Sequence, residues 1–238
     1  MNPTTNMTKV LIWDWPIRIF HWAFVLCVGG ALGLALLAEP GGKLFVWHML
    51  LGIAACFLLL MRLALGFFGS RHNRFYAMLF SPAETLRYVW AIVTFRPLHY
   101  VAHNPGAAVA AFGMYAGTVG LFWSGLKAGG ELARHIHIGL AYVMLALAVA
   151  HLAGVTANAL RSRGEAALSM LNGKRTGSLE AGLASSQPLL ALVVVLLVGL
   201  WLGGLFASYD AAKGTVKLPL LGCTLPLEKV ETETPAAK

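Results

Sequence analysis

Residues 135–160 read HIHIGLAYVMLALAVAHLAGVTANAL, and this stretch decides the fold class. It contains no Asp, Glu, Lys or Arg, and it exceeds the roughly 20 residues that a helix needs to cross a bilayer. It also contains histidines, which are costly inside a membrane unless they face a partner. The stretch therefore predicts a membrane-spanning helix that carries a functional site.

Two of these histidines, His137 and His151, lie fourteen residues apart. At about 100° and about 1.5 Å per residue, they are roughly 40° apart around the helix and about 21 Å apart along its axis. By the same geometry, His135 points roughly 160° away from His151. We expect His137 and His151 to act near opposite membrane surfaces, and His135 to be an interfacial residue.

Four further stretches are long and apolar enough to span a bilayer, at residues 17–38, 44–68, 105–126 and 189–209. The composition fits this class, because 58% of the residues are hydrophobic, 12% are charged and the mean hydropathy is +0.71. Short connections join the first span to the second and the third to the fourth, so each pair should be antiparallel. The predicted fold is all-α, an integral membrane four-helix bundle plus a fifth C-terminal span.

Basic residues concentrate in the N-terminal segment and in the connections at residues 71–103 and 160–188. The short connections on the opposite side carry only Lys43, Lys127 and Arg134. Because cytoplasmic loops are enriched in Lys and Arg, the N-terminus is expected in the cytoplasm and the C-terminus on the opposite side of the membrane. This pattern accounts for the net charge of +8, so no nucleic-acid partner is expected.

The 71–103 connection contains a helix start. Ser81 precedes Pro82, and Glu84 stands at the capping-box position. A short helix lying on the cytoplasmic surface is predicted here, with a second basic surface segment at residues 160–188.

Two more histidines, His21 in the first span and His48 in the second, complete two pairs at matching depths. His48 matches His137 near the outer surface, and His21 matches His151 near the cytoplasmic surface. Each pair can fill both axial positions of a haem iron, which suits electron transfer rather than substrate binding. The chain is therefore expected to bind two haem b groups, with the axial pairs His48/His137 and His21/His151.

Other interpretations of the histidines stay open. A single imidazole in a span can simply hydrogen-bond a neighbouring helix, although four at matched depths make this less persuasive. A copper or zinc site would need further ligands, yet the spans contain no carboxylate and the cysteines, Cys27, Cys56 and Cys223, form no CxxC pair. A proton relay would also need Asp or Glu within the spans.

Several residues near the histidines are candidates for binding the cofactor. Gly52 lies one turn after His48, where a missing side chain would let a flat group approach. Arg18 and Arg62 are candidate partners of haem propionates, because guanidinium binds carboxylates through two parallel hydrogen bonds. The alternative role of these arginines is to anchor helix ends on the cytoplasmic side. The small residues of the third span, Gly113, Ala116, Gly117 and Gly120, equally fit ordinary close helix packing.

Several motifs resemble the prokaryotic cytochrome b561 family, which includes related hydrogenase cytochrome b subunits. They are WDWPIRIFHW at 13–22, WHMLLG at 47–52 with Arg62, FGSRHNRF at 68–75, HNPG at 103–106, MLNGK at 170–174 and the His137-to-His151 spacing. The resemblance runs from about Trp13 to Arg175. It departs at Ala102, where the family usually has Gly, and it does not reach the fifth span or the tail with Cys223.

The resemblance implies a four-helix bundle with two haem b groups, each held by two histidines. It also implies electron exchange with quinones and with a carrier, often a periplasmic c-type cytochrome. Because the family is prokaryotic, it further implies a place in the bacterial inner membrane, with the C-terminus in the periplasm. The predicted function is electron transfer between the quinone pool and such a partner. The alternatives are a stand-alone superoxide:quinone oxidoreductase, a cytochrome b subunit of a hydrogenase-like complex and a non-redox membrane anchor.

Three regions are expected, the haem domain at residues 1–176, a linker and fifth span at 177–209 and an extracytoplasmic tail at 210–238. The fifth span contains no histidine or methionine, so it lacks the usual ligands of a haem iron and is expected to face lipid or a partner helix. A partner helix would make the protein a homo- or hetero-oligomer. Its tail should either cover a partner's surface or pack back on its own bundle.

Overall fold

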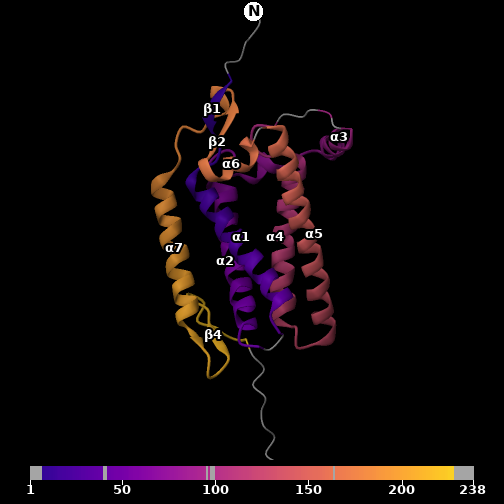
Figure 1. The fold of residues 1–238 in the computed structure, drawn as a ribbon. Coiled ribbons are helices and arrows are strands. Elements are labelled where there is room, and N and C mark those ends of the chain that lie inside the picture. Colours follow the sequence, from indigo (N-terminus) through magenta and orange to yellow (C-terminus); the bar gives the residue numbers. More distant parts are fainter. Residues whose placement is uncertain (1–6, 40–41, 95, 97–99, 163, 228–238) are drawn as a thin grey trace, which may run out of the picture.

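The computed structural model describes residues 7–39, 42–94, 96, 100–162 and 164–227, whose helices form an elongated bundle (Figure 1). Five of the described helices are long and apolar enough to cross a membrane, namely α1 (Trp15–Leu37), α2 (Phe45–Phe68), α4 (Pro105–Leu126), α5 (Glu131–Arg161) and α7 (Pro188–Ala207). They confirm the predicted helical class and the five spans. The chain is a multi-pass membrane protein.

Polar caps begin three of the helices, and a proline stands at the first or second helical position after each cap. Backbone N–H groups donate to Asp14 before α1 at 3.2 Å, to Asn104 before α4 at 2.8 Å, and to Ser81 before α3 (Pro82–Val93) at 3.1 Å. The helix start predicted at Ser81 is thereby confirmed. α3 lies beside one end of the bundle (Figure 1), and it leaves Leu86 and Trp90 exposed.

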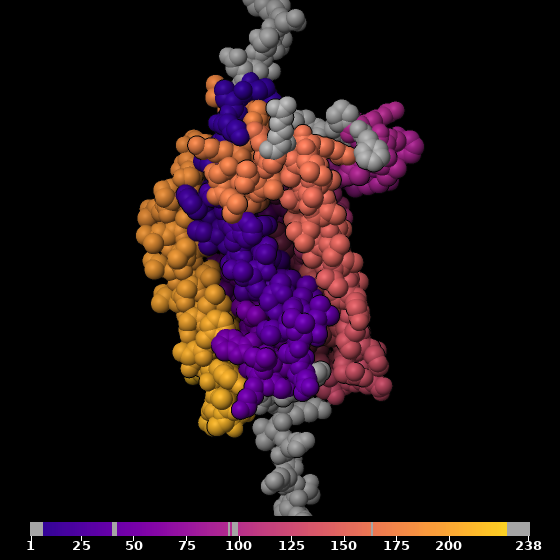
Figure 2. Space-filling view, viewed as in Figure 1, coloured from indigo at the N-terminus to yellow at the C-terminus, as the bar shows by residue number. Residues whose placement is uncertain are grey.

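The bundle consists of two hairpins joined along one side. α1 packs on α2, α4 packs on α5, and α2 packs against α4, whereas α1 and α5 barely touch. A groove therefore runs between α1 and α5 (Figure 2). The α5 wall of this groove is open, since Met144 is the only buried residue among the described residues of α5.

Three glycines of α4 let α5 approach closely. A Cβ added at Gly113 would lie 2.9 Å from Leu147, one at Gly117 would lie 3.1 Å from Met144, and one at Gly120 would lie 2.9 Å from Leu140. These contacts favour the packing interpretation of the small residues over a role in binding a cofactor.

α7 packs on α1 and α2, on the side away from α5 (Figure 1). Trp201 of α7 stacks on Phe57 of α2 with ring centroids 3.9 Å apart, and Val194 and Val198 join the core that contains Phe24 of α1. The fifth helix is thus an integral part of the bundle, and its remaining surface is an exposed aliphatic face.

The tail forms a small antiparallel sheet that the sequence did not predict. Its strands are β3 (Tyr209–Asp210), β4 (Thr215–Lys217) and β5 (Thr224–Pro226). Val216 and Leu218 pack on Val46 and Leu50 at the start of α2. Residues 209–227 therefore pack back on their own bundle, while residues 228–238 of the expected tail lie outside the described residues. We call this end of the molecule the β4 end.

The opposite end, which we call the β1 end, is covered by the chain's N-terminal segment and by the connection before α7. β1 (Thr8–Leu11) pairs antiparallel with β2 (Lys174–Gly177), which follows α6 (Glu165–Asn172). Short 3-10 helices lie nearby, η1 (Phe75–Met78) and η2 (Leu179–Ala181). Arg71 donates to the carbonyls of Glu180 and Gly182, so the α2–α3 connection is also bound into this cover.

Glu165 joins the strands of this cover to α6, and it makes the cover pH-dependent. Its carboxylate lies 2.8 Å from Lys9 Nζ and accepts from Thr176 Oγ1 at 2.9 Å. These two hydrogen bonds, the one from Lys9 first, lower the pKa of Glu165. Because the folded-state pKa is depressed, the stabilisation is present above the unfolded value and is lost as pH falls through the folded value.

We expect the amide protons of β1 and β2 to exchange faster, relative to intrinsic rates, below about pH 4 than at about pH 6. The Glu165→Gln variant should exchange fast at both pH values. Hydrogen exchange followed by mass spectrometry measures this, and wild-type protection that is the same at both pH values would contradict the role given to Glu165.

Candidate functional site

His48 of α2 and His137 of α5 face each other near the β4 end. Their ring centroids lie 6.0 Å apart, with ring planes at 77°. His48 Nδ1 lies 2.8 Å from the carbonyl oxygen of Ala31, and His137 Nδ1 lies 3.0 Å from that of Leu121 and 3.1 Å from Ser124 Oγ. A proton on each Nδ1 donates to a carbonyl and leaves Nε2 free, which is how proteins orient histidines that bind metals.

The separation of these two rings fits one iron held between them. An imidazole–metal bond of about 2.0–2.1 Å on each side, plus the ring radii, places two centroids about 6.3 Å apart. Within the described ranges, no three His, Cys, Asp or Glu side chains gather as a metal-binding group. Two facing imidazoles therefore suit a macrocycle that supplies the other four ligands, as haem does.

His21 of α1 and His151 of α5 form the second pair, toward the β1 end. The two imidazoles are close enough to interact electrostatically. Trp22 contacts the His21 ring edge-on, with centroids 5.1 Å apart. His21 Nδ1 is buried and finds no hydrogen-bond partner among the described residues. Buried polar atoms are nearly always bonded, so this nitrogen suits a bound group or metal.

The structure brings His48 and His137 together, and it places His21 and His151 near enough for their charges to interact. The role of all four as iron ligands stays a prediction. His135 is exposed on α5, as expected of an interfacial residue. Gly52 lies on α2 in open space, because an added Cβ would meet no other atom within 4 Å. A flat group could approach there, and a role for Gly52 in binding haem stays a prediction.

Arg62 of α2 lies inside the bundle with only 1% of its surface exposed. Its Nε donates to Tyr115 Oη at 3.1 Å, one terminal nitrogen donates to Met78 Sδ at 2.9 Å, and the guanidinium lies 4.6 Å from the Phe75 ring centre. The other terminal nitrogen is buried without a partner in the described part of the chain. A buried cation is costly unless an anion compensates it, so this site is suited to an anionic group.

His103 lies near Arg62, just before α4. Its ring stands edge-on to Trp13 with centroids 4.8 Å apart, and its Nδ1 is buried without a partner in the described residues. Burial, together with the charges of Arg62 and His72, lowers the pKa of His103 to about 3. The imidazole is therefore neutral at ordinary pH. The sequence showed His103 only as part of a family motif, since its burial depends on residues far away in the chain.

Arg18 is already engaged at the β1 end. Its Nε donates to the carbonyl of Met170 at 3.3 Å, and its guanidinium lies 4.0 Å from the centre of the Trp15 ring. Trp22 Nε1 donates to the same carbonyl at 3.1 Å. Arg18 therefore ties α1 to α6. Arg62, one of whose nitrogens has no partner among the described residues, is the better placed of the two to bind a propionate.

These features define a class of protein, a membrane bundle of apolar helices in which histidines on facing helices pair at two depths. The family model for prokaryotic cytochrome b561 matches residues 12–173, which is more than half of the 238 residues, and the chain belongs to this family. No curated protein and no solved structure matches the chain. Membership makes the chain a membrane b-type cytochrome that binds haem b and transfers electrons, and it confirms the resemblance found in the sequence.

Proposed function

We propose that this cytochrome holds two haem b groups, between His48 and His137 and between His21 and His151. It passes electrons between the quinone pool and a periplasmic redox partner such as a c-type cytochrome. The observation that carries the proposal is the first pair, whose rings lie 6.0 Å apart with each Nδ1 bonded to a carbonyl.

The placement of the two pairs supports transfer across the membrane. His137 and His151 are fourteen residues apart on α5, which is about 21 Å along a helix axis. Haem would supply reversible one-electron chemistry, and the two histidines of each pair would hold it, which suits electron transfer rather than substrate binding. The residues of this chain hold the two groups at separate depths, one nearer each surface.

Charge supports the orientation and the propionate site. The connections at the β1 end carry most of the Lys and Arg residues, so this end faces the cytoplasm and the β4 end faces the periplasm of the inner membrane. Arg62, one of whose buried nitrogens has no partner in the described part of the chain, binds a propionate of the haem held by His21 and His151, and Arg18 is the second candidate. Residues 1–176 form the haem domain, 177–209 the linker and fifth helix, and 210–238 the extracytoplasmic tail.

The haem content tests the proposal directly. Purified protein should give close to two haem b per polypeptide in a pyridine haemochrome assay, and no covalently bound haem. One haem, or none, would contradict the double pairing. A visible spectrum without haem bands would leave only a non-redox anchor.

The partner is tested by turnover. The proteoliposome-bound cytochrome should oxidise a quinol only when a soluble electron acceptor protein is added on the periplasmic side. Quinone reduction driven by superoxide without any second protein would instead favour a stand-alone oxidoreductase. Co-purification with a hydrogenase-type subunit in mild detergent would favour the hydrogenase-like complex.

A further inference from the structure

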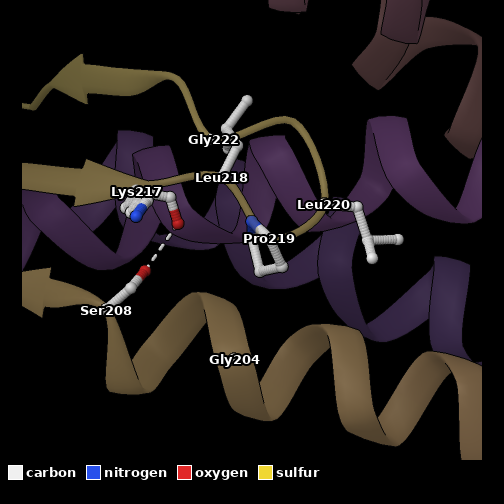
Figure 3. A pocket seen from close by; sticks show the side chains of 7 residues that line it. All are labelled: Gly204, Ser208, Lys217, Leu218, Pro219, Leu220 and Gly222. Carbon is white, nitrogen blue, oxygen red and sulfur yellow. Dashed lines mark hydrogen bonds between the residues drawn. The ribbon is translucent and has the colours of Figure 1, made fainter.

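The loop between β4 and β5, residues 218–223, turns back along the end of α7 (Figure 3). Pro219 lies directly against Gly204, where an added Cβ would come within 3.2 Å of its ring. Gly204 stands three residues before Ala207, the last residue of α7. At about 1.5 Å per residue, the loop therefore reaches back beside the last turn of α7, to about 4.5 Å before the end of this membrane-spanning helix.

The tip of this loop is apolar and points outward. Leu220 is 94% exposed and Leu221 is 74% exposed. Leu220 also has a φ of 70°, in the left-handed region that is unfavourable for residues other than glycine. Exposed leucines are unfavourable in water and favourable in hydrocarbon. A strained backbone that turns leucine outward is therefore explained by lipid around the tip.

An open surface hollow of about 340 Å³ lies between the loop and α7, lined by Gly204, Ser208, Lys217, Leu218, Pro219, Leu220 and Gly222. Its walls are mostly apolar, and the Ser208 hydroxyl is already bonded to the Lys217 carbonyl at 2.6 Å (Figure 3). Lys217 is its only charged residue, and it forms no ion pair with any described residue. Lys213, by contrast, is paired with Asp210 at 3.2 Å. An apolar hollow with one cation that is unpaired among the described residues fits an acyl chain and its phosphate.

The lipid-facing surface of α7 leads directly into this hollow. Leu200 and Leu197 lie one and two turns before Gly204 on the same helix face, and both are exposed. An acyl chain lying along that face can enter between Gly204 and the loop without crossing a polar surface.

We propose that residues 217–222 form a phospholipid-binding site. Leu220 and Leu221 enter the leaflet at the β4 end, one acyl chain lies between the loop and Gly204, and the lipid phosphate binds the Lys217 ammonium. The site is independent of the haem assignment, because it uses none of the four histidines.

A fluorophore at the loop tip tests the depth. Leu220→Cys is labelled with NBD in a chain carrying Cys27→Ala, Cys56→Ala and Cys223→Ser, with haem absorbance retained as the check of folding. The matched control is Lys213→Cys in the same background. In nanodiscs, doxyl-labelled lipid should quench the label at 220 several-fold more than the label at 213, and iodide should do the reverse. Equal iodide quenching at both positions would overturn the proposal. It would also be overturned if the label at 220 were protected from iodide only after a soluble redox protein is added.

The headgroup is tested in the otherwise unaltered chain. Native mass spectrometry of protein from nanodiscs containing phosphatidylglycerol should show several-fold less retained anionic lipid for Lys217→Gln than for the wild type. Lys213→Gln is the control and should retain the wild-type amount. Retention that is unchanged in Lys217→Gln, or reduced equally in both variants, would overturn the role of Lys217.

Discussion

Replacing His137 with alanine should leave the purified protein with one haem b instead of two. His137 and His48 face each other at 6.0 Å, and the His137 ring is fixed by the carbonyl of Leu121 and the hydroxyl of Ser124. Without His137 the iron keeps a single protein ligand and the pocket gains a hole, so that haem should be lost on purification. The pyridine haemochrome value should fall from about two to about one per chain, because each pair serves one iron.

Three further variants test the assignment of one haem to each histidine pair. His135→Ala, two residues away and exposed, should keep both haems. His151→Ala should also lose one haem, and the combination of His137→Ala with His151→Ala should lose both. If His135→Ala loses a haem while His137→Ala keeps two, the assignment by helical phase is wrong.

The histidine pairs could be predicted because they depend mostly on the regularity of one helix. α5 is continuous from Glu131 to Arg161, so counting residues between His137 and His151 gives both their shared face and their separation. The short connections then show which helices are antiparallel, and the depth of each histidine in the membrane shows which two can pair. The Ser81 helix start was equally readable, because a cap, a proline and a glutamate lie within four residues.

Other parts of the molecule depend on contacts between residues that lie far apart in the chain, and the sequence alone does not show these contacts. Arg62 meets Tyr115 and Met78, and His103 meets Trp13, across separations that only the packed bundle brings together. The tail sheet was missed for another reason. Its strands have two or three residues, which is too short for an alternating pattern, and it is held by Val216 packing on α2.

Replacing Arg62 with glutamine should lower the midpoint potential of the haem held by His21 and His151. The ferric form carries one more positive charge than the ferrous form, so loss of a nearby buried cation stabilises the ferric form. At an effective dielectric constant of about 20, a charge about 8–12 Å from the iron changes the energy difference between the two forms by about 1.4–2 kcal/mol. For one electron, about 59 mV corresponds to a tenfold change, so a fall of about 60–90 mV is expected. Potentiometric titration of the visible bands measures it.

The pattern across variants separates a propionate partner from a structural arginine. Arg62→Lys keeps the charge and should shift the potential less, whereas Arg18→Gln, whose guanidinium is bonded to Met170, should shift it little. The haem held by His48 and His137 lies about 21 Å farther along α5 and should keep its potential in every variant. Two results would contradict a propionate contact: equal shifts at both haems, or unchanged potentials with two haems retained. The buried guanidinium of Arg62 would then only join α2 to Tyr115 and Met78.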